Sequence, residues 1–296
     1  MKVCKRLCAF CLMIVLCMNL MACTQEEEKN EKVEGLEELG EIQVAAREEG
    51  SGTRSVFADL TGLRTEKDGE ISDLTKKDAK ILYSGEEILS FVSESKNRIG
   101  YMSLGTENEN DNIKTLSVNG VFPDIDSIAK GKYPLGRTFY LVYSGKLSEL
   151  EQNFLAFVRG KGQDIVSKTF APIGKSTEFL PNMESGTIRI HGSTSMAPLM
   201  QELAVEYMRL NPNAVIEVKA SDSGEGALDT VTGTCEFGMM SRELETYEKE
   251  LLDYEAIAKD GIVVVVNKEN PLTDISIEQL GNIYCGDIKN WEEINQ

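Results

Sequence analysis

Two short segments of this 296-residue chain combine small hydroxyl residues with glycine in a pattern that suits anion binding. They are Arg47-Glu-Glu-Gly-Ser-Gly-Thr53 and His191-Gly-Ser-Thr-Ser195. Each precedes a stretch with helical periodicity, so free backbone N–H groups and the positive dipole end of a helix would face the bound group. The guanidinium of Arg47 adds a fixed fork for a bidentate oxyanion contact, and we expect Glu49 to hold that fork in place.

Two further segments repeat this arrangement later in the chain. Ser221-Asp-Ser-Gly-Glu-Gly226 follows a strand-like run, and Phe237-Gly-Met-Met-Ser-Arg242 marks the end of another. The carboxyl ends of parallel strands meet at one edge of a sheet, where ligands of open α/β sheets gather. We therefore expect these segments to share one site. Arg242 suits an anion contact or a surface ion pair equally well.

The elements that must position these segments alternate between strand-like and helix-like runs, which predicts an α/β fold. The continuous apolar run at 262–266 is typical of a strand covered on both faces. A Ser276/Gln279 capping box begins the last helix. The expected strands are 42–46, 99–102, 113–118, 138–143, 187–190, 215–218 and 262–266, and the expected helices are 53–60, 86–93, 148–158, 197–210, 242–252 and 277–284.

The N-terminal region has the pattern of a lipoprotein signal peptide at residues 1–22, with Cys23 as the lipidation site. Its apolar stretch is shorter than the roughly 20 residues that span a bilayer, which disfavours the alternative of a membrane-spanning anchor. Residues 23–40 are rich in glutamate and predict an acidic tether. The formal net charge of −18 argues against nucleic acid as a partner.

Of the seven cysteines, only Cys235 and Cys285 lie in the expected folded part. Their spacing forms no metal cluster, and we expect two buried free thiols rather than the alternative of one disulfide. Residues 174–186 lack either periodicity and are predicted to be a linker between a front and a back portion.

Together these segments closely resemble the phosphate-binding proteins of ABC transporters, a family with a two-lobed periplasmic-binding-protein-like fold. The resemblance also covers 255–267, 283–291 and Tyr133-Pro-Leu-Gly-Arg-Thr-Phe139, and it extends over most of residues 42–296. By position in the family's motifs, it implies phosphate contacts at Thr194, Ser195, Ser223, Ser241, Arg47, Ser51, Gly52 and Thr53.

Position 241 departs from the pattern of well-studied members, which carry an aspartate there. That carboxylate accepts the proton of hydrogen phosphate and repels sulfate, whereas a hydroxyl imposes no charge penalty on sulfate. The preference between the two ions therefore stays open, unless Asp222 or Glu225 takes the place of the aspartate.

The order of the segments is reversed relative to the usual family arrangement, because the Gly-Ser-Thr-Ser loop comes after the Arg-containing loop. We therefore predict a circularly permuted α/β fold with a two-strand hinge. Residues 41–125 and 268–296 would form the lobe with the Arg47/Ser51 loop. Residues 126–267 would form the lobe with the Thr194 and Ser223 loops, joined internally through the 174–186 linker. A remnant of a rearranged gene that binds poorly and a swapped dimer are the alternatives.

The expected function is that of an extracytoplasmic solute-binding protein, held at the cell membrane by its lipid (palmitate), which captures inorganic phosphate for the permease of an ABC transporter. The alternatives are a binder of another tetrahedral oxyanion such as sulfate, and a non-transporting surface sensor or adhesion module. We expect no enzyme, no cofactor and no metal. A hydrolase using Ser193 with His191 would lack the orienting acid of a triad, and His191 is expected instead to cap its strand.

Overall fold

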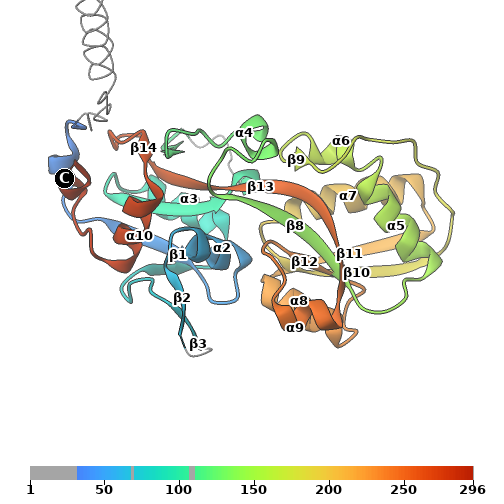
Figure 1. Ribbon diagram of the computed structural model, residues 1–296. Coiled ribbons are helices and arrows are strands. Elements are labelled where there is room, and N and C mark those ends of the chain that lie inside the picture. Colours follow the sequence, from blue (N-terminus) through green and yellow to red (C-terminus); the bar gives the residue numbers. More distant parts are fainter. Residues whose placement is uncertain (1–31, 68–69, 107–110, 296) are drawn as a thin grey trace, which may run out of the picture. The chain divides into compact units, whose positions relative to one another are not determined.

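The structure is a computed structural model that describes residues 32–67, 70–106 and 111–295 (Figure 1). The predicted signal peptide, Cys23 and the first part of the predicted tether lie outside the described residues. No described helix combines the length and the apolar character that crossing a membrane requires.

Helices and strands alternate along the chain, as the α/β prediction requires. The elements of residues 32–129 are η1 (Leu36–Glu38), β1 (Gln43–Arg47), α2 (Gly52–Leu60), β2 (Arg64–Lys67), β3 (Glu70–Asp73), β4 (Lys80–Leu82), α3 (Gly85–Ser93), β5 (Arg98–Ser103), η2 (Leu104–Thr106), β6 (Ile113–Thr115), β7 (Ser117–Val118) and α4 (Ile125–Ala129). Those that follow are β8 (Gly136–Tyr143), α5 (Glu149–Arg159), α6 (Gln163–Val166), β9 (Ala171–Pro172), β10 (Gly186–Ser193), α7 (Ala197–Leu210), β11 (Ala214–Ser221), α8 (Ser223–Val231), β12 (Phe237–Met240), α9 (Thr246–Leu251), β13 (Asp253–Asn267), β14 (Asp274–Ile275), α10 (Ile277–Cys285) and η3 (Trp291–Asn295).

One long strand, β13, is shared between two parts of the main sheet, whose order is β11-β10-β12-β8-β13-β5-β1-β4. Its first half pairs antiparallel with β8, and its second half pairs antiparallel with β5. Figure 1 shows β8 and β13 running side by side between two groups of elements. These two strands therefore form the connection between the two halves of the sheet.

Each half of the sheet has its own hydrophobic core. We call residues 36–135 with 262–294 the first lobe, because their buried side chains form one large cluster that contains Trp291 and Phe57. We call residues 139–258 the second lobe, whose cluster contains Phe154 and Tyr207. The chain therefore passes from one core to the other close to residues 136 and 260, whereas the lobe boundaries were predicted at 125/126 and 267/268.

The apolar run at 262–266 is covered on both faces, as predicted. Ile262, Val264 and Val266 belong to the large cluster of the first lobe. Val263 and Val265 face the opposite side, where they join Ile88 and Val92 of α3 in a separate cluster. The predicted capping box of α10 is confirmed, since Ser276 and Gln279 cap each other's backbone N–H groups.

Several elements differ from the sequence prediction. The helix expected at 242–252 begins only at Thr246, because Glu245 is extended and forms a capping box with Glu248. The β2–β3 hairpin and β4 were not predicted. The hairpin strands are rich in charged residues and β4 has only three residues, so their sequences lack a clear alternation of apolar and polar positions.

The predicted acidic tether is too long at its C-terminal end. Leu36 in η1 and Leu39 are buried in the first core, so residues 36–39 are part of the folded lobe. The glutamates beside them conceal these two apolar positions in the sequence. The predicted linker at 174–186 is irregular as expected up to Ser185, although Phe179 packs against the second core.

We predict that Leu36→Ala lowers the free energy of unfolding by about 2–5 kcal/mol, because it removes a fully buried leucine side chain from the first core. Urea denaturation measures this change. Leu180→Ala is the matched control, since Leu180 is 85% exposed and its loss should change the free energy by less than about 0.5 kcal/mol. Equal midpoints for the two variants would contradict the assignment of Leu36 to the core.

Candidate functional site

The first predicted loop connects β1 to α2 and rests on a stack of aromatic rings. The ring of Phe57 lies parallel to that of Tyr101, with centroids 3.9 Å apart, and Tyr284 packs against both at an angle. The Tyr101 hydroxyl accepts a hydrogen bond from the backbone N–H of Arg47, and the Tyr284 hydroxyl donates to the carbonyl of Ala45. These contacts fix the end of β1 and therefore the position of the Arg47 side chain.

Arg47 is almost fully buried, and its guanidinium is held as a fork. Nε and Nη2 donate to the two carboxylate oxygens of Glu48, each at 2.8 Å, and Nη2 also donates to the Tyr83 carbonyl. The expectation that Glu49 holds this fork is wrong, because the neighbouring Glu48 reaches the guanidinium edge. The positive charge of Arg47 is thus balanced within the loop.

The remaining predicted residues of this loop form the start of α2. Gly50 has a positive φ of 88°, which turns the chain so that the side chain of Ser51 accepts a bond from the backbone of Arg54 and caps the helix. Gly52 and Thr53 are the first two residues of α2, and Ser51 and Thr53 are buried. The hydroxyls of Ser51 and Thr53 therefore lie at the N-terminus of α2.

The second lobe contributes three loops at the carboxyl ends of β10, β11 and β12. These strands are mutually parallel in the order β11-β10-β12, which places the three exits at one sheet edge, as predicted. Ser195 lies before α7, Ser223 is the first residue of α8, and Ser241 directly follows β12. All three hydroxyl residues are buried. The sheet thus gathers them from segments up to 46 residues apart.

Hydrogen bonds join these hydroxyls into a cluster. Ser193 donates to the hydroxyl of Ser241 at 2.9 Å, and the hydroxyls of Ser223 and Ser241 lie 3.2 Å apart. The backbone N–H of Ser241 donates to the Ser223 hydroxyl. Ser193 was considered in the sequence only as a catalytic nucleophile, but its hydroxyl is a member of this cluster.

The loops of the two lobes are in direct contact. Nη2 of Arg47 donates to the Thr194 hydroxyl at 2.9 Å, and the hydroxyls of Thr53 and Ser195 lie 2.9 Å apart. Gly52 packs so closely that an added Cβ would lie 2.5 Å from the Ser223 hydroxyl and 2.6 Å from that of Ser241. The eight predicted site residues are therefore brought together, and only glycine fits at position 52.

Sequence reasoning missed one buried residue of this cluster, Arg137. Its Nη1 donates to the Thr53 hydroxyl at 2.7 Å, and its Nε donates to Asp260 at 2.8 Å. Burial raises the pKa of Asp260 and lowers that of Arg137, while the pairing of the two groups opposes both shifts. The Gly-Arg-Thr segment is part of the family resemblance, but a single arginine on a strand does not indicate in the sequence which residues it will contact.

Asp222 and Glu225, the two carboxylates considered as replacements for the family's aspartate at position 241, both have other partners. Asp222 caps α8 by accepting from the N–H of Glu225, and Glu225 pairs with Lys219. The carboxylates of Asp222 and Glu225 instead help to line a cleft of about 670 Å³ that also contains Thr194, Glu48 and Glu49. The open side of the hydroxyl cluster is therefore acidic.

Other residues singled out in the sequence have structural partners. Arg242 forms an ion pair with Glu248, but both side chains are buried rather than at the surface. His191 Nδ1 lies 2.7 Å from Asp229 of α8, so it binds a helix rather than capping its strand. Cys235 and Cys285 are free thiols as predicted, with Cys235 buried and Cys285 partly exposed.

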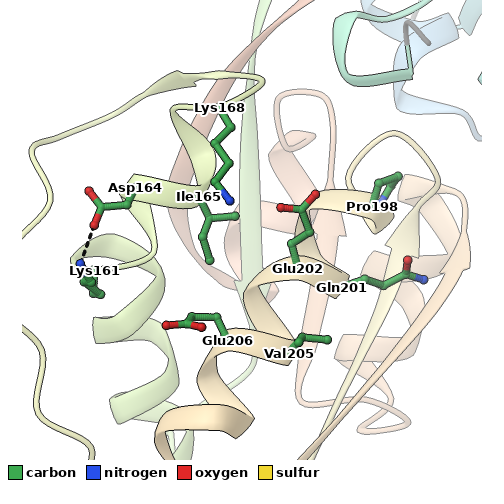
Figure 2. A pocket seen from close by; sticks show the side chains of 9 residues that line it. All are labelled: Lys161, Asp164, Ile165, Lys168, Pro198, Gln201, Glu202, Val205 and Glu206. Atoms are coloured by element: carbon green, nitrogen blue, oxygen red, sulfur yellow. Dashed lines mark hydrogen bonds and ion pairs between the residues drawn. The ribbon is translucent and has the colours of Figure 1, made fainter. Parts of the chain in front are cut away.

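Another groove lies on the second lobe between α6 and α7 (Figure 2). It measures about 730 Å³ and is lined mainly by charged side chains, including the Lys161–Asp164 ion pair and Glu202. None of the buried hydroxyl residues lines it. We place the candidate site at the hydroxyl cluster, because donors from both lobes converge there and not in this groove.

The buried cluster can bind an oxyanion through neutral donors. The arginine side chains carry only donors, so Arg47 and Arg137 occupy lone pairs of Thr194 and Thr53 and leave the hydroxyl hydrogens free to donate. The N-termini of α2 and α8 add backbone N–H groups and positive dipole ends. This chemistry suits a small tetrahedral anion enclosed between two lobes.

Comparison with known proteins gives three findings. A family described as a PBP superfamily domain matches residues 29–161 and 181–296. The phosphate-binding protein PstS 2 of Streptococcus pneumoniae is 39% identical over 259 residues, which cover 86% of this chain and 88% of that protein. The phosphate-binding protein PstS of Bacillus subtilis is 36% identical over only 115 residues, or 37% of this chain and 38% of that protein.

The fold has a counterpart among solved structures. The crystal structure of a phosphate-binding protein of a phosphate ABC transporter from Streptococcus pneumoniae superposes with a TM-score of 0.73 at 38% identity. The match covers 86% of this chain and all of that chain. The two-lobed periplasmic-binding-protein-like fold is therefore confirmed.

Proposed function

We propose that this chain, which belongs to the family of phosphate-binding proteins within the PBP superfamily, captures inorganic phosphate outside the cytoplasm and delivers it to the permease of an ABC transporter. The observation that carries this proposal is the buried cluster of hydroxyls and arginines, in which donors from both lobes meet. Closure of two lobes around a ligand is the motion that such an arrangement supports.

The phosphate would be held mainly by dipoles. Arg47 is balanced by Glu48 and Arg137 by Asp260, so the site carries little net positive charge. We propose Thr194, Ser195, Ser223, Ser241, Arg47, Ser51, Gly52 and Thr53 as the phosphate contacts, through hydroxyl, guanidinium and backbone N–H groups. Because these donors are buried, each hydrogen bond to an ionised oxygen is strong.

Phosphate is favoured over sulfate by one feature of Ser241. Its oxygen accepts a bond from Ser193 and, when its own hydrogen is donated to Ser223, retains a second lone pair that can accept the proton of hydrogen phosphate. Sulfate carries no proton at neutral pH and would leave this acceptor unused. A binder of sulfate is the second candidate, because a hydroxyl does not repel that ion as a carboxylate would.

The relatives are named as phosphate-binding proteins, one of them of a phosphate ABC transporter, and we propose a binding role for this chain as well. Ser193 and His191 have separate partners, Ser241 and Asp229, and do not form a nucleophile and base pair. We therefore propose a binding protein without enzymatic activity.

We also propose that the segment order is a circular permutation. The backbone N–H of Ile42 donates to the carbonyl of Lys289, and that of Trp291 donates to the carbonyl of Gly40. Residues near the end of the described chain thus lie against the first strand, where the usual order would continue directly. The Bacillus subtilis protein aligns over only 37% of this chain, as expected when a collinear alignment follows one of two exchanged halves, whereas the Streptococcus pneumoniae relative aligns over 86% and would share the present order.

Membrane attachment is proposed through a lipid on Cys23, at the end of the predicted signal peptide. We predict that Cys23→Ser releases the protein from the membrane fraction into the medium of the producing cells, because a thiol is needed to carry the acyl chains. Immunoblotting of both fractions measures this. Equal membrane retention of the variant would argue against the lipid anchor.

The central prediction concerns anion affinity. Calorimetric titration of the protein without its signal peptide should show saturable phosphate binding, and sulfate should bind at least about tenfold more weakly, since a single hydrogen bond accounts for such a difference. Equal binding of both ions would favour the oxyanion alternative. Absence of binding for both would end the proposal.

In the same titration, Arg47→Ala should weaken phosphate binding about 100-fold, because the variant loses a charge-assisted donor and leaves the Glu48 carboxylate unpaired beside the anion. Arg159→Ala is the matched control, since the Arg159–Glu255 pair is exposed and belongs to the second lobe alone. If both variants bind like the wild type, the assignment of the Arg47 loop is wrong.

The permutation is tested by a reordered protein that begins near residue 182, joins residue 296 to residue 33 and ends near residue 181, so that the buried Leu36 and the packed Phe179 are both retained. We expect this protein to fold and to bind phosphate within about threefold of the original affinity, because new termini in an irregular exposed segment are tolerated. Failure to fold would show that the 174–186 connection is required and that the present order is not a simple rejoining.

A further inference from the structure

Arg137 and Asp260 face each other at the point where the chain passes between the two lobes. They are direct cross-strand partners on β8 and β13, and the next pair in register is Gly136 with Gly261. Residue 135, just before β8, belongs to the core of the first lobe, and residue 139 belongs to that of the second. On β13, residue 258 belongs to the core of the second lobe and residue 262 to that of the first. This ion pair therefore lies on the two strands that connect the lobes.

The guanidinium of Arg137 contacts groups from both lobes at once. Nη1 donates to the hydroxyl of Thr53, which belongs to α2 of the first lobe, and to the backbone carbonyl of Ser241 in the second lobe, at 2.7 and 3.2 Å. Nε and Nη2 lie 2.8 and 2.7 Å from the same oxygen of Asp260. Nε donates a hydrogen bond to that oxygen, Nη2 forms an ion pair with it, and Ser103 donates the second hydrogen bond.

These contacts determine what Thr53 can offer to a ligand. A guanidinium only donates, so Arg137 must occupy a lone pair of the Thr53 oxygen and leave the hydroxyl hydrogen available to Ser195 or to an oxyanion. The second contact holds the Ser241 backbone, whose N–H and hydroxyl belong to the same cluster. Burial of a charged pair is costly, and a well-packed hydrophobic pair would stabilise the fold as well.

We propose that Arg137 is a positioning residue for the oxyanion site: it orients the Thr53 hydroxyl as a donor and joins the first-lobe and second-lobe loops when the lobes close. Asp260 holds the guanidinium in place and balances its charge. This inference rests on the proposed function, because phosphate binding is the property that the pair would support.

The test uses phosphate titration of the whole protein and a variant without the charged pair, Arg137→Met with Asp260→Asn. Removing both charges avoids an unpaired buried ion, and urea denaturation checks that the fold is retained. We expect phosphate affinity to fall at least about tenfold, as loss of a charge-assisted contact would give. The matched control, Arg189→Met with Glu236→Gln, removes a pair within the second lobe and should bind phosphate within about threefold of wild type.

A double-mutant cycle with Thr53→Val separates positioning from general destabilisation. The triple variant combines Thr53→Val with Arg137→Met and Asp260→Asn. If Arg137 acts through Thr53, its fold-loss of phosphate affinity should be much smaller than the product of the fold-losses caused by Thr53→Val and by the Arg137→Met/Asp260→Asn pair. Additive losses, or unchanged affinity of the Arg137→Met/Asp260→Asn variant, would overturn the proposal.

If the Arg137→Met/Asp260→Asn variant does not fold, the variant Arg137→Lys tests the positioning role of Arg137 instead. Lysine keeps the charge but cannot hold Asp260, Thr53 and Ser241 in one planar arrangement, so we expect an intermediate loss of phosphate affinity. Wild-type affinity in this variant would refute the inference. If the wild-type protein itself does not bind phosphate, the proposed function fails instead, and the two failures are thus distinguished.

Discussion

The bond from the Arg47 guanidinium to the Thr194 hydroxyl is the contact on which the rest of the site depends, because it joins a buried cation of one lobe to the loop of the other lobe for which we propose anion contacts. The cation is fixed by Glu48 and by the Tyr83 carbonyl, and its strand is fixed by the aromatic rings beneath it. Contacts within the first lobe therefore hold Arg47 in place, and its bond to Thr194 is the one that depends on the relative position of the two lobes.

Charge balance is the second constraint. Both buried arginines have carboxylate partners, and the cleft outside the hydroxyl cluster is lined by acidic side chains in a chain with a net charge of −18. Attraction of an anion over long distance is thus weak, and selectivity must come from short-range hydrogen bonds in the closed cluster. Arg137 fits this scheme because it sets the direction of a hydroxyl without adding net charge.

The sequence predicted the parts of the structure that follow local rules. The segments of α7 and α10 and the covered strand at 262–266 were located from periodicity and capping signals. The eight residues taken from the family resemblance lie close together in the fold, and their contact with phosphate stays a prediction. The sequence did not predict contacts that depend on the fold. Glu48 rather than Glu49 binds Arg47, which depends on how the loop after β1 turns, and Arg137 meets Thr53 across 84 residues, because the fold brings β8 against the start of α2. Leu36 was hidden among glutamates for the same reason, since its burial comes from tertiary packing.

A crystal structure of the protein grown with phosphate tests the central claim most directly. The account predicts one phosphate enclosed between the lobes, with its oxygens within hydrogen-bond distance of the Arg47 guanidinium in the first lobe and of Ser195 and Ser223 in the second. Phosphate bound to one lobe alone, or held only by the lysines of the groove between α6 and α7, would contradict it.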